Sequence, residues 1–258
     1  MDDAGYADFR MTADLVANEA DRGGGPAALT PVVFVPGLLC DQALWRRQID
    51  ALADIAAPIV ADVTLDDDIV AMAARALVAA PPRFALVALS MGGYVALEML
   101  RQAPHRITRL ALIDTSATPD APLRAEQRRR GMASLERGRF VGITTKLLHQ
   151  LLHSKHVDGP VGDTLRAMAL RVGGAAFLRQ QRAILNRPDP TPTLARIALP
   201  TLVAVGADDR ITPVAHAEHL HAAIAGSVLH LFPDCGHLPA LECPDALSAV
   251  LRDWLTTG

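Results

Sequence analysis

Short apolar runs alternate with longer amphipathic segments along most of the chain. Runs rich in valine, leucine and alanine predict six strands, at residues 32–35, 58–63, 84–88, 109–114, 201–205 and 228–232. Segments in which apolar residues recur every three or four positions predict helices at 42–52, 67–80, 91–102, 213–225 and 244–256. This alternation is typical of an α/β protein with a mostly parallel sheet covered by helices on both faces.

The alternation stops between the fourth and fifth strands. Residues 119–195 predict helices only, separated or ended by turn-rich stretches such as GPVGD and NRPDPTP. A helical insertion at this point predicts a cap over the carboxyl edge of the sheet, where open α/β sheets bind ligands. We therefore divide the chain into a core domain, residues 1–118 and 196–258, and a helical cap (lid) insertion, residues 119–195.

The composition is that of an ordinary globular protein. The chain has 258 residues, of which 50% are hydrophobic and 21% charged, and its formal net charge is −3. Because no basic stripe is present, we expect a small-molecule substrate as partner, with no nucleic acid and no membrane. The arginines at 128–130 are interpreted as a solvated helix face. The sequence leaves monomer and homodimer open.

Cysteine usage predicts a cytoplasmic location. Cys40, Cys235 and Cys243 are odd in number and lack C-x-x-C spacing, so a disulfide framework is not expected. The first residues, MDDAGYADF, are acidic and lack the apolar core of a signal peptide.

Ser90 lies in ALSMGG, at the junction of a predicted strand and a predicted helix. A serine on such a turn exposes its hydroxyl, and the N–H groups of the helix N-terminus can stabilise a developing oxyanion. Ala88 stands where the G-x-S-x-G elbow has its first glycine. Taken alone, the segment fits a helix N-cap better than a nucleophile turn.

A nucleophilic serine needs a base, and the base needs an acid that orients it. Asp208 and Asp209 follow the strand at 201–205, and His237 follows the strand at 228–232. Separately, the aspartates fit a helix cap and the histidine fits a surface loop. In the order Ser90, Asp209, His237, each after a strand, they match the triad of an α/β hydrolase.

Two backbone N–H groups are expected to form an oxyanion hole. One belongs to Met91, which follows the nucleophile, and the other to Leu38 in the loop VPGLLCD after the first long strand. Gly37 allows that loop to turn sharply.

Four segments carry a resemblance to the capped esterase, lactonase and perhydrolase-like enzymes of the α/β-hydrolase fold: PGLLCDQALW, ALSMGGYVALE, GADDRITP and CGHLPALECP. In the family stretch G-x-x-D-x-x-x-P the acid falls on Asp209, with Asp208 as fallback. Some relatives place the acid at the position of Asp114. The resemblance also implies an N-terminal antiparallel hairpin, for which residues 9–19 are the candidate.

The chain departs from the family pattern at two places. Pro36-Gly37 replaces the common H-G of the oxyanion loop, which leaves the backbone donor in place. The stretch ADVTLDDD replaces the frequent D-x-x-G-x-G-x-S, so we expect an unusual pocket wall near Thr64 to Asp68.

The sequence therefore predicts a serine hydrolase that cleaves an ester, lactone or thioester of a small, largely apolar substrate through an acyl-enzyme. Leu39, Trp45 and Tyr94 are candidate pocket residues, and an uncharged, mainly hydrophobic acyl group is expected. We expect no cofactor and no metal ion, and interpret His149 and His153 as a cap pair without zinc. The alternatives are a cofactor-free perhydrolase, a C–C bond hydrolase, and a ligand-binding protein with slow turnover.

Overall fold

Six parallel strands form the sheet of the computed structural model, which describes residues 28–138 and 140–257. The strand order is β2-β1-β3-β4-β5-β6. The strands are β1 (Thr30–Val35), β2 (Ala56–Val60), β3 (Phe84–Leu89), β4 (Ile107–Ile113), β5 (Thr201–Gly206) and β6 (Val228–Phe232). The predicted fold class is confirmed, whereas the hairpin expected at residues 9–19 lies outside the described residues.

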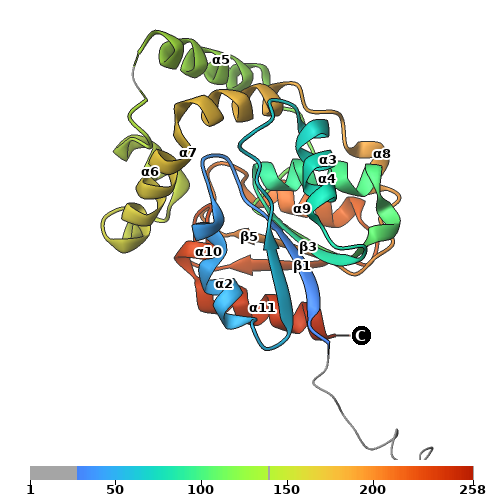
Figure 1. Ribbon diagram of the computed structural model, residues 1–258. Helices are drawn as coiled ribbons and strands as arrows, with labels where there is room; N and C mark the ends of the chain where they lie inside the picture. The colour runs from blue at the N-terminus through green and yellow to red at the C-terminus, as the bar shows by residue number, and fades with distance from the viewer. Residues whose placement is uncertain (1–27, 139, 258) are drawn as a thin grey trace, which may run out of the picture.

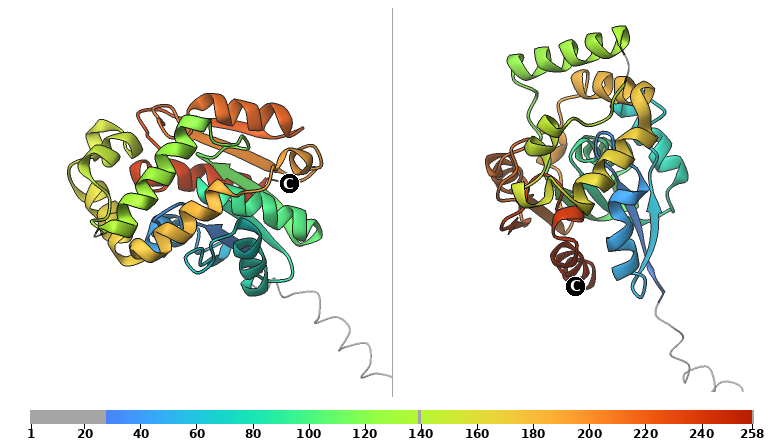
Figure 2. Two further views of the ribbon diagram at one scale, coloured as in Figure 1. Left: turned by 90° about the horizontal axis from the view of Figure 1, so that it is seen from above. Right: turned by 90° about the vertical axis from the view of Figure 1, so that its left-hand side faces the viewer.

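Alternating side chains of the strands enter two separate hydrophobic cores, because successive residues of a strand point to opposite faces. Val33 and Val35 pack with α3 (Ile69–Ala79), α4 (Met91–Gln102) and α9 (Val214–Ala223) on one face. Val32 and Phe34 pack with α2 (Arg46–Ala51) and α11 (Pro244–Thr256) on the other. Figures 1 and 2 show these helices on the two sides of the sheet. The central run at 84–88 is therefore apolar at every position.

The segment between β4 and β5 contains helices and no strand in its described part, residues 114–138 and 140–200. Its α-helices are α5 (Pro122–Arg137), α6 (Thr145–Leu151), α7 (Pro160–Leu185) and α8 (Thr191–Leu194). Helix α7 bends at Gly173, whose φ of 78° is not helical. In Figure 1, α5, α6 and α7 lie above the edge at which the parallel strands end. The domain boundaries at 118/119 and 195/196 stay predictions.

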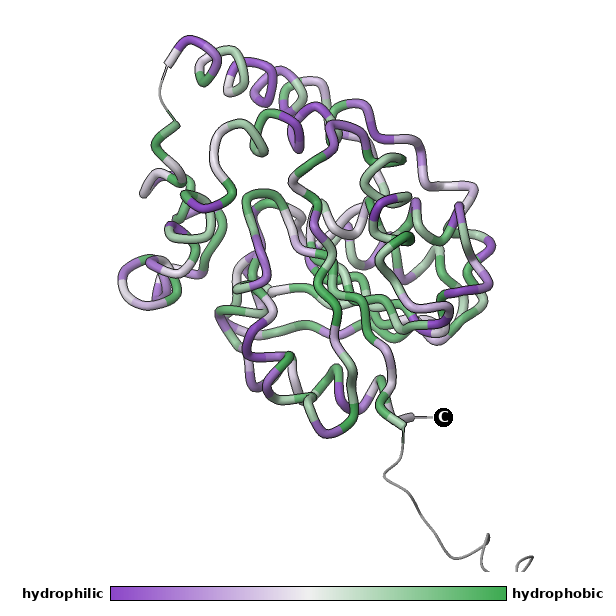
Figure 3. The backbone as a smooth tube through the Cα atoms, viewed as in Figure 1, coloured by the Kyte–Doolittle hydropathy of each residue, from purple (hydrophilic) through white to green (hydrophobic). Residues whose placement is uncertain are grey.

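Hydropathy differs sharply between the sheet and the outermost helix. Figure 3 shows the strands mostly green and α5 mostly purple, and no α5 residue is buried. Of the helices in the described residues, none has both the length and the hydrophobicity required to cross a bilayer.

Two expected elements differ in detail. The helix expected at 42–52 is a 3-10 turn, η1 (Gln42–Trp45), followed by α2, and Asp41 caps the turn by accepting from the Ala43 N–H at 2.9 Å. Strand β2 begins at Ala56 and ends at Val60. The remaining short helices are η2 (Pro104–Arg106), η3 (Ser154–His156) and α10 (Pro239–Glu242).

Candidate active site

Ser90 lies on the tight turn between β3 and α4. Its φ of 55° is rare for a residue other than glycine. The turn is held by its own backbone, since the Ser90 N–H donates to the Ile113 carbonyl at 3.0 Å and the Ser90 carbonyl accepts from the Thr115 hydroxyl at 2.7 Å. The Ser90 side chain makes no capping hydrogen bond to α4. The N-cap interpretation is therefore wrong.

The two glycines after Met91 let α4 approach its neighbours. A Cβ on Gly92 would lie 2.3 Å from the Val35 carbonyl oxygen, and one on Gly93 would lie 2.2 Å from the Thr115 Oγ1. Any side chain at these positions would push the helix away from β1 and from the loop after β4. The spacing S-x-G-G thus serves backbone packing around the serine turn.

A continuous chain of hydrogen bonds joins Ser90, His237 and Asp209. The His237 Nε2 lies 2.8 Å from the Ser90 Oγ, and the Nδ1 lies 2.8 Å from the Asp209 Oδ2. The carboxylate also accepts from the Ile211 N–H at 2.7 Å and from the Thr212 hydroxyl at 2.7 Å. Burial opposes ionisation of Asp209, but attraction to His237 and these hydrogen bonds hold its pKa well below the usual value. The structure thus brings together the three residues that the sequence singled out.

The other two candidate acids have different surroundings. Asp208 is half-exposed, and its Oδ2 lies 4.0 Å from the Nε2 of His153. Asp114 is buried behind Asp209, and its Oδ1 accepts from the Gly206 N–H at 3.0 Å. Burial and repulsion from Asp209 raise the pKa of Asp114 well above its usual value, which favours its protonated form. Asp209 is the carboxylate that contacts the histidine.

The loop that carries His237 is attached to helix α6 and to Glu242. The His237 N–H donates to the Leu151 carbonyl at the end of α6, at 2.7 Å. The buried Glu242 carboxylate accepts from the N–H groups on both sides of the histidine, those of Gly236 at 3.1 Å and Leu238 at 3.0 Å. It also accepts from the His153 N–H at 2.7 Å. Glu242 was not among the sequence candidates, although a single acid within the apolar run LPALEC is a signal for a buried, hydrogen-bonded carboxylate.

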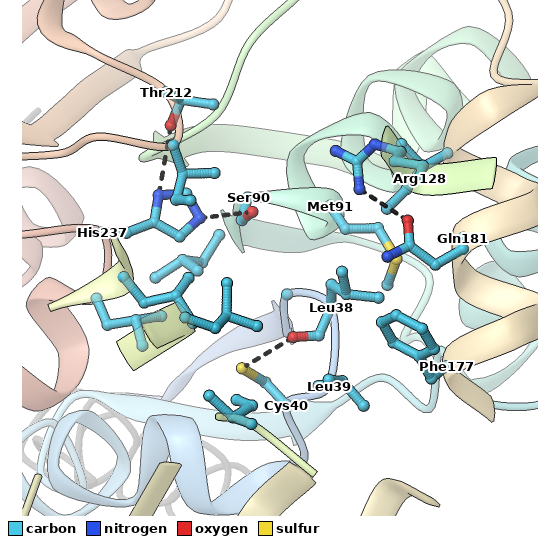
Figure 4. A pocket seen from close by; sticks show the side chains of 18 of the residues that line it. Leu38, Leu39, Cys40, Ser90, Met91, Arg128, Phe177, Gln181, Thr212 and His237 are labelled. Carbon is cyan, nitrogen blue, oxygen red and sulfur yellow. Dashed lines mark hydrogen bonds between the residues drawn. The ribbon is translucent and has the colours of Figure 1, made fainter. Parts of the chain in front are cut away.

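Ser90 and His237 line a cavity of about 270 Å³ under the helices of the insertion. Leu38, Leu39 and Met91 line it near the serine (Figure 4). Tyr94 also lines the cavity. Other apolar lining residues include Ile143, Leu147, Leu151, Leu165, Phe177 and Leu238.

Two expectations about the pocket wall are wrong. Trp45 is fully buried in the core, with its ring centroid 5.2 Å from that of Phe34, and does not reach the cavity. Residues 64–68 do not line the cavity either. They are used in turns and ion pairs outside it, such as Asp66 with Arg75 at 2.7 Å.

The cavity also has polar residues that the sequence did not single out. Arg124, Gln127 and Arg128 of α5 and Gln181 of α7 line its wall. The side chain of Arg128 is only 13% exposed. Its assignment to a solvated helix face is therefore wrong, although the side chains of Arg129 and Arg130 are 62% and 79% exposed, as expected. A helical pattern does not say which side of a polar helix covers a cavity.

Two groups of metal-ligating side chains occur in the described residues. Asp114, Asp209 and His237 form one group. Its members make the hydrogen bonds described above, between Asp209 and His237 and between Asp114 and the Gly206 N–H. His153, Asp208 and Asp234 form the other, which lies outside the cavity. His149 belongs to neither group.

The strand order of the sheet, the helical insertion and the tight turn at Ser90 together define a hydrolase-type fold. The comparison with known families agrees. The model of the Alpha/beta hydrolase family matches residues 32–250, and the chain belongs to this family.

Among curated proteins, the chain is similar to a pimeloyl-[acyl-carrier protein] methyl ester esterase of Neisseria meningitidis serogroup C. The two are 32% identical over 175 residues, which cover 64% of this chain and 67% of the relative. It is also similar to a 2-hydroxy-6-oxo-6-phenylhexa-2,4-dienoate hydrolase of Burkholderia cepacia, with 38% identity over 82 residues, 32% of this chain and 29% of the relative.

Among solved structures, the chain resembles a thermophilic esterase from Thermogutta terrifontis, solved with malate bound. The TM-score is 0.79, with 29% sequence identity over 88% of this chain and 89% of that one. These three relatives are two esterases and a hydrolase named for a dienoate.

Proposed function

We propose that this protein is a carboxylic ester hydrolase that works through a covalent acyl-enzyme on Ser90. The observation that carries the proposal is the hydrogen-bonded series from Ser90 through His237 to Asp209, whose serine end opens into an apolar cavity. A serine hydroxyl becomes a useful nucleophile only when a base accepts its proton, and the histidine here lies at the distance that this transfer needs.

In the first half-reaction, the Ser90 Oγ attacks the ester carbonyl carbon while its proton passes to the His237 Nε2. The N–H groups of Leu38 and Met91 stabilise the negative charge that develops on the carbonyl oxygen. The tetrahedral intermediate then collapses, and the C–O bond to the alcohol breaks. The departing oxygen takes the proton from His237, which leaves the acyl group on Ser90.

In the second half-reaction, a water molecule gives its proton to His237 and attacks the acyl carbon. Collapse of this second intermediate returns the proton to Ser90 and releases the carboxylic acid. Asp209 holds the imidazole so that the Nε2 faces the serine, and its negative charge stabilises the imidazolium in both halves.

Several observations support an ester as the substrate class. Most side chains on the cavity wall are apolar, which suits an acyl chain. The curated relative that matches 64% of the chain is a methyl ester esterase, and the similar solved structure is an esterase. The hydrolase of a dienoate matches only 82 residues. We therefore rank ester hydrolysis above C–C cleavage, perhydrolysis and slow ligand binding.

We also propose a cytoplasmic location, with a small molecule as the partner of the site. The three cysteines of the chain are free thiols, which suits a reducing compartment. Burial, followed by the neighbouring Asp41 charge, raises the pKa of Cys40 to about 12, so its thiol is not a competing nucleophile at neutral pH.

A hydrolysis screen tests the proposed function. We expect the purified chain to cleave p-nitrophenyl esters of graded acyl length, and Ser90→Ala to lower kcat/KM by several orders of magnitude, on the order of 10⁴-fold or more. Ser134→Ala, which changes an exposed serine of α5, is the matched control and should keep wild-type rates. Equal rates for wild type and Ser90→Ala, or turnover only when hydrogen peroxide and a carboxylic acid are both supplied, would contradict the proposal.

A further inference from the structure

The cavity wall has a polar end on the side away from the histidine. Arg128 and Gln181 lie there, and Figure 4 shows them across the cavity from His237, joined to each other by a hydrogen bond. Arg124 and Gln127 of α5 also line the wall. A pocket built only for an apolar acyl chain has no use for guanidinium groups, because burying a charge away from water is costly.

The positive charge at this end exceeds the negative charge. Asp120 is the single acidic partner within 4.0 Å that the described residues offer to Arg124, Arg128 and Arg187. Its carboxylate oxygens lie 2.5 Å from the Arg128 Nε and 3.0 Å from the Arg187 Nη2. Burial opposes its ionisation, but the surrounding guanidinium groups keep the pKa of Asp120 below its usual value. Three guanidinium groups therefore surround one carboxylate, and two of them, those of Arg124 and Arg128, line the cavity.

The hydrogen bond between Arg128 and Gln181 leaves donors for a ligand. The Arg128 Nη1 donates to the Gln181 Oε1 at 2.8 Å. Because a guanidinium has donors only, it is the amide oxygen of Gln181 that faces Arg128, and the amide NH₂ faces elsewhere. Neither that NH₂ nor the Arg128 Nη2 hydrogen-bonds to another of the described residues. The pair thus provides both N–H donors and positive charge to a ligand that accepts hydrogen bonds.

We propose that Arg128 and Gln181 bind a carboxylate at the far end of the acyl group, so that the preferred substrate is a half-ester of a dicarboxylic acid. This inference rests on the proposed ester hydrolysis. His237 protonates the leaving alcohol, so the alcohol lies on the histidine side and the acyl chain extends toward the opposite end, where Arg128 lies. A carboxylate matches the site because its two oxygens accept charge-assisted hydrogen bonds from a guanidinium.

This substrate differs from the uncharged acyl group that the sequence predicts. The apolar composition of the motif segments describes the wall near Ser90 and His237, where the lining is indeed mostly apolar. The charged end is contributed by helices α5 and α7, whose orientation over the cavity is set by tertiary packing. The acyl group is therefore apolar along its chain and anionic at its end.

The test compares two series of substrates of matched length. One series contains the monobutyl esters of succinate, glutarate, adipate and pimelate, and the other contains butyl alkanoates with a methyl group in place of the carboxylate. We expect wild type to prefer at least one half-ester over its neutral counterpart. Arg128→Met should lower kcat/KM for that half-ester by about 10- to 100-fold more than for its neutral counterpart, as expected for a lost hydrogen bond to a charged group.

Two further variants distinguish loss of the carboxylate site from a general loss of folded enzyme. Gln181→Glu is nearly isosteric and neutralises Arg128, so it should remove the same preference while neutral esters report an intact site. Arg130→Met makes the same change on the same helix at a side chain that is 79% exposed, and it should alter neither series.

The outcomes separate this inference from the proposed function. If wild type cleaves neutral esters and half-esters alike, or if Arg128→Met and Gln181→Glu affect both series equally, the carboxylate site is wrong and ester hydrolysis stands. If wild type cleaves neither series, the proposed function fails, and the carboxylate site fails with it.

Discussion

Two neighbouring carboxyl groups at the site have pKa values shifted in opposite directions because their surroundings differ. Asp209 receives hydrogen bonds from His237, Ile211 and Thr212, which favour its ionised form. Asp114 is just as buried, but among the described residues it accepts only from the Gly206 N–H, and it faces the charge of Asp209. Because two buried carboxylates repel each other, the pKa of Asp114 is raised and that of Asp209 is lowered. Only one of them can stabilise an imidazolium.

Asparagine substitutions test this difference between the acids. Asp209→Asn should lower kcat by on the order of 10⁴-fold, because it removes the charge and the acceptor that orient His237. Asp114→Asn should keep most of the activity, since the amide resembles a protonated carboxyl and keeps an oxygen for the Gly206 N–H. Asp208→Asn is the exposed control. Steady-state kinetics on one ester decides between them, and a loss at 114 or 208 as large as that at 209 would refute the assignment.

At the scale of elements, hydrogen bonds and backbone packing connect the loop that carries His237 to the helical insertion. The Glu242 carboxylate accepts hydrogen bonds from the backbone N–H groups on both sides of His237 and from the N–H of His153, which follows α6. A Cβ on Gly236 would lie 2.6 Å from the His153 nitrogen, so the two backbones are in direct contact. The position of the imidazole therefore depends on the insertion above it as well as on the sheet below.

Glu242→Gln tests this connection. The amide keeps one acceptor oxygen and places an NH₂ group against N–H donors, so we expect the free energy of unfolding to fall by about 2 kcal/mol. For a chain of this size, that lowers Tm by about 4–8 °C. Because the imidazole loses its support, kcat should fall while KM changes little. Glu218→Gln, at an exposed glutamate, is the control. A fall in Tm with unchanged kcat would show that Glu242 does not position His237.

For the whole molecule, the features that could be predicted from the sequence were those that depend on the local pattern of residues. Apolar runs predicted the strands, and the ends of successive parallel strands had to meet at one edge, which placed Ser90, Asp209 and His237 together. Trp45 and Arg128 were assigned to the wrong surroundings, because the rotation of a helix about its axis is decided by tertiary packing. The same reason hid Gln181, whereas Asp114 was a candidate acid only through the family resemblance and its place at the end of a predicted strand.

The central claim is that Ser90 is the nucleophile, and covalent labelling tests it most directly. The chain is treated with a fluorophosphonate, and the adduct is located by mass spectrometry of the intact protein and its peptides. The account predicts a single adduct on the peptide that contains Ser90, and none on the Ser90→Ala variant. Absence of labelling on wild type, or equal labelling of the two proteins, would contradict it.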